Sequence, residues 1–316
     1  MTRRALTTWW GVLVLAVTAG CAGTAGPPPT GRPTAARAAG GAAAPAGYSG
    51  MARVGPSEYV VVFDRKADDP GPRLALLAVG TEGRLSQRPV TVDGWPDDPP
   101  SDLESVCLLP GGAGELLAAE SGYWEGRFGR IFHLALDLAG AAPRAEVLGS
   151  YPLPVVPEAA EQADYEGIAC AEAEGGGVFV ILGEREGALR WGTLRLGERR
   201  FEVSSQILEV AAPRPGYRPI SDLHLSADGT LWAAATEDPG DAGPFRSLVY
   251  VLARLDLSAA PPVRLATPVR ALWRLDGFKV EALSGPAAAV PGSRLAVGTE
   301  DEGYGGAWRP LGAPEP

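Results

Sequence analysis

The chain of 316 residues is poor in the side chains that mark many catalytic sites, with only two histidines and three cysteines. It has 28 basic against 38 acidic residues, a formal charge of −10, which argues against a nucleic-acid-binding protein because phosphate contacts need a basic surface. No Gly-x-Ser-x-Gly elbow, Walker loop or Cys-x-x-Cys pair occurs, which argues against serine hydrolases, P-loop enzymes and dithiol redox proteins. Only Lys66 and Lys279 are lysines, which we attribute to a codon preference for arginine.

The first apolar run is too short for a membrane-spanning helix, which needs about 20 apolar residues. It extends from Leu6 to Thr18 behind Arg3 and Arg4, as expected of a secretory signal peptide over residues 1–20. The segment ends in Thr18-Ala19-Gly20-Cys21, which resembles a bacterial lipobox and predicts lipidation of Cys21. The alternative is a plain signal peptide followed by an incidental cysteine.

Residues 21–47 are mostly Gly, Ala, Pro and Thr and predict a flexible tether. The expected product is an extracytoplasmic protein that contacts a bacterial membrane, in the periplasm or at the cell surface, through the lipid alone. Of the remaining cysteines, Cys107 and Cys170 lie in apolar runs. We expect two buried free thiols, although an oxidising compartment would also allow them to pair.

The part of the chain after the tether is repetitive. Four segments share one form, and a fifth opens the folded region: Leu103-Glu104-Ser105-Val106, Tyr165-Glu166-Gly167-Ile168, Ile220-Ser221-Asp222-Leu223, Val280-Glu281-Ala282-Leu283 and Tyr48-Ser49-Gly50-Met51. Their second residues are separated by 55, 62, 55 and 60 positions. An apolar run ending in an acidic residue follows each one, at Asp64, Glu120, Glu184, Glu237 and Glu300. Two markers that recur together five times indicate an internal repeat.

Each repeat reads as about four short strands. Residues 130–137 and 248–255 have the aromatic and branched composition of strands, and clusters among the 42 glycines and 30 prolines separate the runs. No stretch has a sustained helical period. We therefore predict an all-β fold, a five-bladed β-propeller over residues 48–311 followed by a tail at 312–316. The runner-up is six blades, with residues 68–100 as a separate blade.

The five repeat residues would form a ring around the axis of such a propeller: Ser49, Glu104, Glu166, Ser221 and Glu281. Three carboxylates facing one another need protons, a basic partner or a cation. An oxygen-only set without His or Cys suits Ca²⁺. The alternative is a structural role, in which these side chains bond backbone amides at the ends of the blades.

The second set of markers should reach the same mouth of the propeller. Carboxylates and arginines beside a divalent ion suit phosphoryl chemistry, so the candidate catalytic residues are Asp64, Arg65, Glu120, Glu184, Arg185 and Glu237. Asp64, Glu120 and Glu237 would orient water or the ion, and the two arginines would hold phosphate. The alternative is a solvated acidic face with surface ion pairs. His133 and His224 are expected to be packing residues.

The order Ser, Glu, Glu, Ser, Glu resembles the ring of the calcium-activated nucleotidase, or soluble apyrase, family. Phe63-Asp64-Arg65 and the Tyr165-Glu166-Gly167-Ile168 element are also similar to that family. The resemblance implies a five-bladed propeller with Ca²⁺ on its axis and nucleotide hydrolysis. Esterase-like phytase-type propellers are a second, shorter resemblance, through Asp102-Leu103-Glu104 and Tyr165-Glu166-Gly167.

The sequence departs from the nucleotidase pattern at two cations. Glu184-Arg185-Glu186 stands where the family has paired arginines, and Thr236 stands where it has a lysine. Two functions therefore remain open. One is a Ca²⁺-dependent hydrolase of phosphoanhydrides or phosphoesters, acting on a phosphate-bearing small molecule. The other is a non-catalytic, monomeric cell-surface binding propeller with a structural Ca²⁺.

Overall fold

The computed structural model describes residues 46–314, apart from 112–113, 125–126, 141, 155–163, 238 and 241. Residues from Ala43 onward belong to one compact unit. The predicted signal peptide, the lipidation site Cys21 and nearly all of the predicted tether lie outside the described residues. In the described part of the chain, no helix is long and apolar enough to cross a membrane.

The described residues form strands and three short 3-10 turns, with no α-helix. The first eleven strands in chain order are β1 (Gly50–Arg53), β2 (Glu58–Val62), β3 (Leu74–Val79), β4 (Leu85–Asp93), β5 (Leu103–Leu108), β6 (Glu115–Glu120), β7 (Tyr123–Trp124), β8 (Arg127–Phe128), β9 (Arg130–Asp137), β10 (Arg144–Pro152) and β11 (Tyr165–Glu172). The next are β12 (Val178–Glu184), β13 (Ala188–Arg195), β14 (Arg200–Val203), β15 (Leu208–Glu209), β16 (Arg218–Leu225), β17 (Thr230–Glu237), β18 (Arg246–Leu255), β19 (Val263–Leu265), β20 (Ala271–Asp276), β21 (Val280–Ser284), β22 (Leu295–Thr299) and β23 (Trp308–Leu311).

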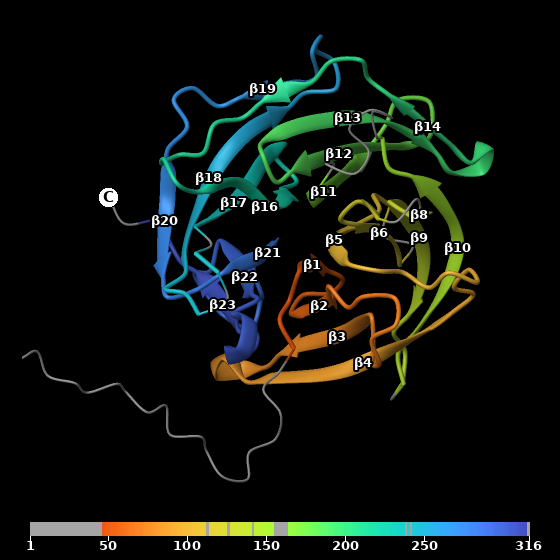
Figure 1. The fold of residues 1–316 in the computed structure, drawn as a ribbon, viewed down its shortest axis with the longest axis horizontal. Helices are drawn as coiled ribbons and strands as arrows, with labels where there is room; N and C mark the ends of the chain where they lie inside the picture. Colours follow the sequence, from red (N-terminus) through yellow and green to blue (C-terminus); the bar gives the residue numbers. More distant parts are fainter. Residues whose placement is uncertain are drawn as a thin grey trace, which may run out of the picture. The chain divides into compact units, whose positions relative to one another are not determined.

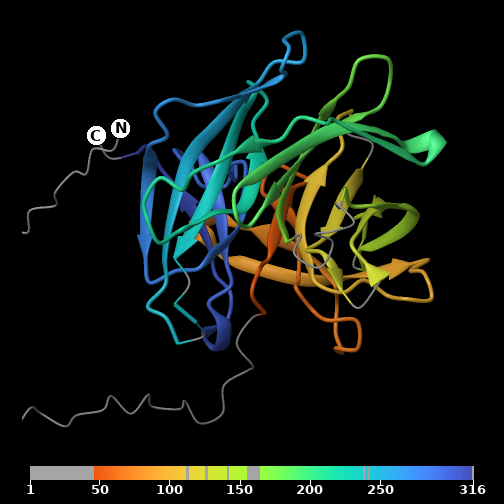
Figure 2. The ribbon, with the colours of Figure 1, turned by 45° about the horizontal axis from the view of Figure 1, so that its top comes forward.

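Antiparallel pairing groups these strands, apart from the separate β7–β8 pair, into five units that begin with β1, β5, β11, β16 and β21. A parallel pairing of β4 with β10 also joins the outer edges of the first two units. Each of these first strands contacts the next, and β21 contacts β1, so the five first strands form a closed ring. Figure 1 shows them around the centre with the later strands of each unit outside, and the turned view of Figure 2 shows the same order. This is the arrangement of a β-propeller, and the predicted all-β propeller class is confirmed.

Alternation of side chains along the strands explains how the units pack. In β2, Val60 and Val62 face the second unit, whereas Tyr59 and Val61 face the last one. The same alternation gives five apolar clusters, one between each pair of neighbouring units. Burial is therefore shared around the ring, and the second strands are almost wholly buried on both faces.

Two glycines let the innermost strands approach each other closely. A Cβ atom on Gly50 of β1 would lie 2.8 Å from the Cα atom of Ser105 in β5. A Cβ atom on Gly167 of β11 would lie 2.6 Å from Cγ of Leu223 in β16. Both distances are shorter than van der Waals contact, so a larger side chain would push neighbouring units apart.

The structure answers two further expectations and shows how the last unit is built. β3 pairs with β2 and β4 pairs with β3, so residues 74–93 supply the outer strands of the first unit and do not form a separate blade. The last unit has three strands, β21 to β23, and no described strand adds a fourth. The expectation of free thiols is wrong, because Cys107 in β5 and Cys170 in β11 form a disulfide. Neighbouring innermost strands bring the two β-carbons together, which sequence distance alone does not show.

Candidate cation-binding site

Among the five predicted ring residues, Glu104, Glu166 and Glu281 are the second residues of their innermost strands, and Ser49 directly precedes β1. Ser221 lies further along, as the fourth residue of β16. Ser49, Glu166, Ser221 and Glu281 are each at most 3% exposed, whereas Glu104 is partly exposed. Inner strands of neighbouring units contact each other throughout the ring, so the first ends of these strands lie at the same mouth. The charges of Glu166 and Glu281 both act on Glu104, so the three carboxylates share one region.

A cavity of about 240 Å³ opens at this mouth, and every described residue that lines it is charged. Glu104, Glu166 and Glu281 line it, but the two ring serines do not. Its described lining comprises eight carboxylates and three cations: Asp64, Asp102, Glu104, Asp164, Glu166, Glu281, Glu300, Glu302, Lys66, Arg185 and Lys279. We call this the axial charged cavity; its excess of carboxylates favours positively charged occupants.

Both lysines of the protein belong to the axial charged cavity. Lys66 forms an ion pair with Asp102, and Lys279 Nζ lies 2.6 Å from Glu302 Oε1 and 3.3 Å from Glu281 Oε1. Codon preference explains why the other basic residues are arginine, but it does not explain why both lysines occupy one cavity. Their scarcity was the sequence signal for the cationic part of the site.

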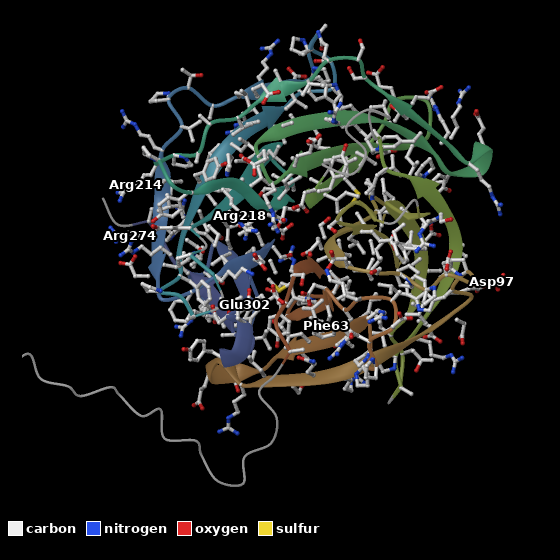
Figure 3. The ribbon with its side chains drawn as sticks, viewed as in Figure 1. Phe63, Asp97, Arg214, Arg218, Arg274 and Glu302 are labelled. Atoms are coloured by element: carbon white, nitrogen blue, oxygen red, sulfur yellow. A yellow bond between two sulfur atoms is a disulfide. The ribbon has the colours of Figure 1, made fainter. Side chains whose placement is uncertain are left out.

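Basic side chains meet two of the three ring glutamates. Arg185 Nε lies 2.6 Å from Glu166 Oε1, and Arg218 contacts both Glu166 and Glu281. Figure 3 shows Arg218 inside the ring, whereas the labelled Arg214 and Arg274 lie at its outer edge. Burial raises the pKa of Glu166 to about 7 although both arginines oppose the shift. A basic partner is thus one of the ways in which the ring charge is neutralised.

Glu104 differs from the other ring glutamates, because it makes no hydrogen bond or ion pair with any described residue. Burial, and then the charge of Glu166, raise its pKa well above the usual range. On the neighbouring strand β1, the buried Oγ atom of Ser49 also has no hydrogen-bond partner among the described atoms. A buried polar atom such as Ser49 Oγ usually has a partner, so Ser49, beside the unpaired Glu104, marks the incompletely satisfied side of the ring.

A carboxyl pair lies on the other side of the axial charged cavity. Glu281 and Glu300 share a hydrogen bond, and burial together with that bond raises the pKa of Glu300 to about 10. Burial opposes ionisation of Glu281 as well, but Glu300, Lys279 and Arg218 hold its pKa below the usual value. At neutral pH the pair therefore holds one proton, carried by Glu300, so a proton also neutralises part of the site.

Ser221 has the structural role that the sequence left open. Its Oγ atom donates to the backbone carbonyl of Val280 at 2.8 Å and lies 3.1 Å from the hydroxyl of Thr236. The next residue, Asp222, is buried and accepts hydrogen bonds from the backbone N–H groups of Leu223 and Leu283. These bonds join β16 to β21, so this part of the ring connects neighbouring units.

The six candidate catalytic residues do not all reach the axial charged cavity: Asp64 and Arg185 line it, and the others do not. Glu120 is fully buried and accepts two hydrogen bonds from the Arg130 guanidinium, at 2.7 and 3.0 Å. Glu184 pairs with Arg190 at 2.6 Å, and Glu237 pairs with the half-exposed Arg246 at 3.0 Å. Arg65 donates to the backbone carbonyl of Pro70.

Sequence reasoning missed several members of the cavity: Lys66, Asp102, Asp164, Lys279 and Glu302. Each follows or precedes a repeat marker by two residues, the positions where the chain enters an innermost strand or leaves the second one. Asp64 and Glu300, which also line the cavity, were found because they are themselves repeat markers at the ends of second strands. Only the pairing of strands shows which flanking residues turn inward.

The donor chemistry of this site fits Ca²⁺, because the unsatisfied groups near Glu104 and Ser49 are oxygen atoms without sulfur or imidazole nearby in the ring. The full five-residue ring is not a ready-made ligand set. In the described part of the chain, no group of three or more His, Cys, Asp or Glu residues is arranged to hold a metal. Glu166 and Glu281 contact basic side chains and Ser221 bonds to backbone, which leaves Glu104 as the first ligand candidate inside the cavity.

The class defined by this fold and site is an all-β propeller with a charged cavity on its axis. No family model and no curated protein matches the sequence. Among solved structures, the chain resembles an exo-1,5-α-L-arabinanase from a bovine ruminal metagenomic library (11% identity, 85% of this chain and 94% of that one, TM-score 0.47). It also resembles the β-propeller domain of Nup133 from Vanderwaltozyma polyspora (10% identity, 77% and 63% covered, TM-score 0.38). These likenesses are weak, and the fold assignment stands on the strand pairing.

Proposed function

We propose that this protein is an extracytoplasmic β-propeller that binds Ca²⁺ at the axial charged cavity, with the ion supporting a cell-surface binding role. Glu104 carries the proposal, because it is a partly exposed carboxylate that lines the cavity among other carboxylates and has no ion-pair partner in the described residues. Glu104 would hold the ion, and Glu166 and Glu281, which line the same cavity, would flank it. When bound, Ca²⁺ would supply the positive charge that the four nearby basic residues do not provide in full.

Thermal unfolding with and without Ca²⁺ tests this proposal. A ligand that binds only the folded state stabilises it by about 2.7 kcal/mol at a hundredfold excess over its dissociation constant. We expect Ca²⁺ to raise the Tm of the full-length protein and excess EDTA to reverse the change. Glu104→Gln should remove the Ca²⁺ response. The control is Glu82→Gln on an exposed turn, which should keep it. A Tm that Ca²⁺ leaves unchanged would contradict the proposal.

A phosphohydrolase related to calcium-activated nucleotidases, or to phytase-type propellers, is the second candidate. It is favoured by the carboxyl pair Glu281–Glu300, whose pKa values move apart, next to Asp64 and Arg185. Such a pair can supply an acid and a base in one site. The ion pairs of the cavity argue against a hydrolase. Arg185 and both lysines already pair with carboxylates, so a phosphate group would have to displace an acidic partner to bind them.

Phosphate release from nucleoside diphosphates, pyrophosphate and phytate, measured with Ca²⁺ and with EDTA, separates the two candidates. The hydrolase requires Ca²⁺-dependent turnover that falls at least a hundredfold in Asp64→Asn, whereas Asp93→Asn at an exposed outer strand leaves it unchanged. Absence of turnover, together with a Ca²⁺-dependent Tm, would select the binding protein.

We further propose that the chain is lipid-anchored at Cys21 and that the propeller lies outside the cytoplasm. The Cys107–Cys170 disulfide supports this location, because such bonds persist in oxidising compartments. Metabolic labelling with a fatty acid in a bacterial host should mark the full-length protein and fail in Cys21→Ser. Labelling that survives this substitution would contradict the anchor.

A further inference from the structure

A second and larger cavity lies at the mouth opposite the axial charged cavity. It has a volume of about 660 Å³ and is lined by the second halves of all five innermost strands, β1, β5, β11, β16 and β21. All but five of its lining residues are apolar or glycine, whereas the axial charged cavity has only charged residues. The two mouths of one ring thus offer opposite chemistry, and this volume lies within the range of small-molecule sites, about 300–1,000 Å³.

The polar groups of this apolar mouth are concentrated at one corner. A methyl group placed on Gly285 would lie 3.6 Å from the Arg53 guanidinium carbon and 3.7 Å from His224 Nε2, so both side chains meet beside this glycine. Ser284 also lines this corner, and its hydroxyl accepts a hydrogen bond from the backbone N–H of Arg53. Glu172, the one acidic residue of the lining, lies on β11, which is not a neighbour of β1 in the ring.

Neither group at this corner is neutralised by an acidic side chain of the described chain. Arg53 donates to the backbone carbonyl of Pro286 at 2.9 Å and forms no ion pair with any described residue. His224 makes no hydrogen bond with a described residue, and burial together with the Arg53 charge lowers its pKa to about 4. At neutral pH the corner therefore presents one positive charge and an uncharged imidazole that can donate a hydrogen bond.

The remaining walls are suited to an apolar group. Val106, Ile168, Leu223 and Leu283 come from four different innermost strands, and the Cys107–Cys170 disulfide forms part of the wall between β5 and β11. A ligand that occupies the cavity would remove apolar surface from water at about 25 cal/mol per Å². It would also bring an anionic group to the cationic corner.

We propose that the apolar mouth binds a small organic carboxylate with a flat or chain-like apolar body. The carboxylate accepts hydrogen bonds from Arg53 and His224, and the body packs against the apolar walls. This site is separate from the axial charged cavity and does not depend on the Ca²⁺ proposal.

A matched pair of probes tests the inference: 2-naphthylacetate and its neutral amide, 2-naphthylacetamide, titrated into the full-length protein by calorimetry. We expect the acid to bind at least tenfold more tightly than the amide at pH 7, because only the acid carries charge to Arg53. Excess EDTA should not change this ratio. Equal affinities, or no binding of either probe up to 1 mM, would overturn the proposal without bearing on Ca²⁺.

Substitutions locate the effect. Arg53→Met keeps an apolar stem and should weaken the acid at least tenfold while leaving the amide unchanged, and Arg53→Lys should restore part of the difference. Arg254→Met, at an exposed arginine paired with Asp228, is the control and should have no effect. If Arg53→Met binds 2-naphthylacetate as tightly as the unmodified protein does, Arg53 is not the carboxylate-binding group and the proposal is wrong. If Arg53→Met does not fold, the comparison of acid and amide in the unmodified protein decides.

Discussion

At the scale of single residues, His224 illustrates how burial sets a charge state. Its pKa falls to about 4 in the folded protein, because burial and then the nearby Arg53 both disfavour the imidazolium. The ordinary value near 6.5 applies when the chain is unfolded. Between the two pKa values, His224 is protonated in the unfolded chain but neutral in the folded protein. Acid therefore favours unfolding through this residue.

We therefore predict that His224 lowers stability as the pH falls from about 6.5 to about 4, by up to about 3 kcal/mol, and has no such effect above pH 7. His224→Gln cannot be protonated in this range and should lose less stability on acidification. Urea unfolding of both proteins at pH 7.5 and pH 4.5 measures the difference. Parallel losses in the two proteins would contradict the prediction.

Glu120 and its partner Arg130 provide a second residue-scale case. Arg130 contributes two hydrogen bonds to this buried carboxylate, and its guanidinium also lies 4.9 Å from the Phe132 ring. Removing one member of a buried pair leaves an uncompensated charge, which costs about 3–5 kcal/mol. An exposed pair contributes about 0–1 kcal/mol.

We expect Arg130→Met to destabilise the protein by about 3–5 kcal/mol, and Arg144→Met, in an exposed pair with Asp93 in the same sheet, to cost about 1 kcal/mol or less. Urea unfolding of both variants checks the difference. A similar small loss in each would mean that Glu120 does not depend on Arg130, and would reopen a role for Glu120 in chemistry.

At the scale of elements, the innermost strands are held together by more than apolar packing. The disulfide joins β5 to β11 across a sequence separation of 63 residues. In the chain-entropy account, closing a loop of that length restricts the unfolded chain by about 4 kcal/mol. The bond also borders the apolar mouth, so it fixes the wall that we propose for ligand binding.

The double variant Cys107→Ser, Cys170→Ser should therefore lose about 4 kcal/mol of stability, and reduction of the unmodified protein should lower it by a similar amount. Denaturant unfolding under oxidising and reducing conditions measures both. A reduced protein as stable as the oxidised one would contradict a bracing role for this disulfide.

Element-scale patterns were also the part of the structure that the sequence predicted best. The repeat markers at Glu104 and Glu120 correspond to the first ends of innermost strands and the last ends of second strands, because one unit pairs in the same way each time. The partners Arg218 and Lys279 were missed, because ion pairing between units depends on how strands of different repeats face each other. No local pattern records that relation.

At the scale of the whole molecule, the ring has two chemically different mouths. The first ends of the innermost strands surround carboxylates, and the second ends surround apolar side chains with one cationic corner. We propose that Glu104, which has no ion-pair partner among the described residues of the axial charged cavity, enables this protein to bind Ca²⁺. Strand pairing and five apolar clusters hold the cavity in place, so the ion would meet a rigid frame.

Calorimetric titration of Ca²⁺ into the full-length protein at neutral pH tests that claim most directly. We expect one binding event in the unmodified protein, and an affinity at least tenfold lower in Glu104→Gln but unchanged in Glu82→Gln. No heat of binding at millimolar Ca²⁺, or equal affinity in Glu104→Gln, would contradict the proposal.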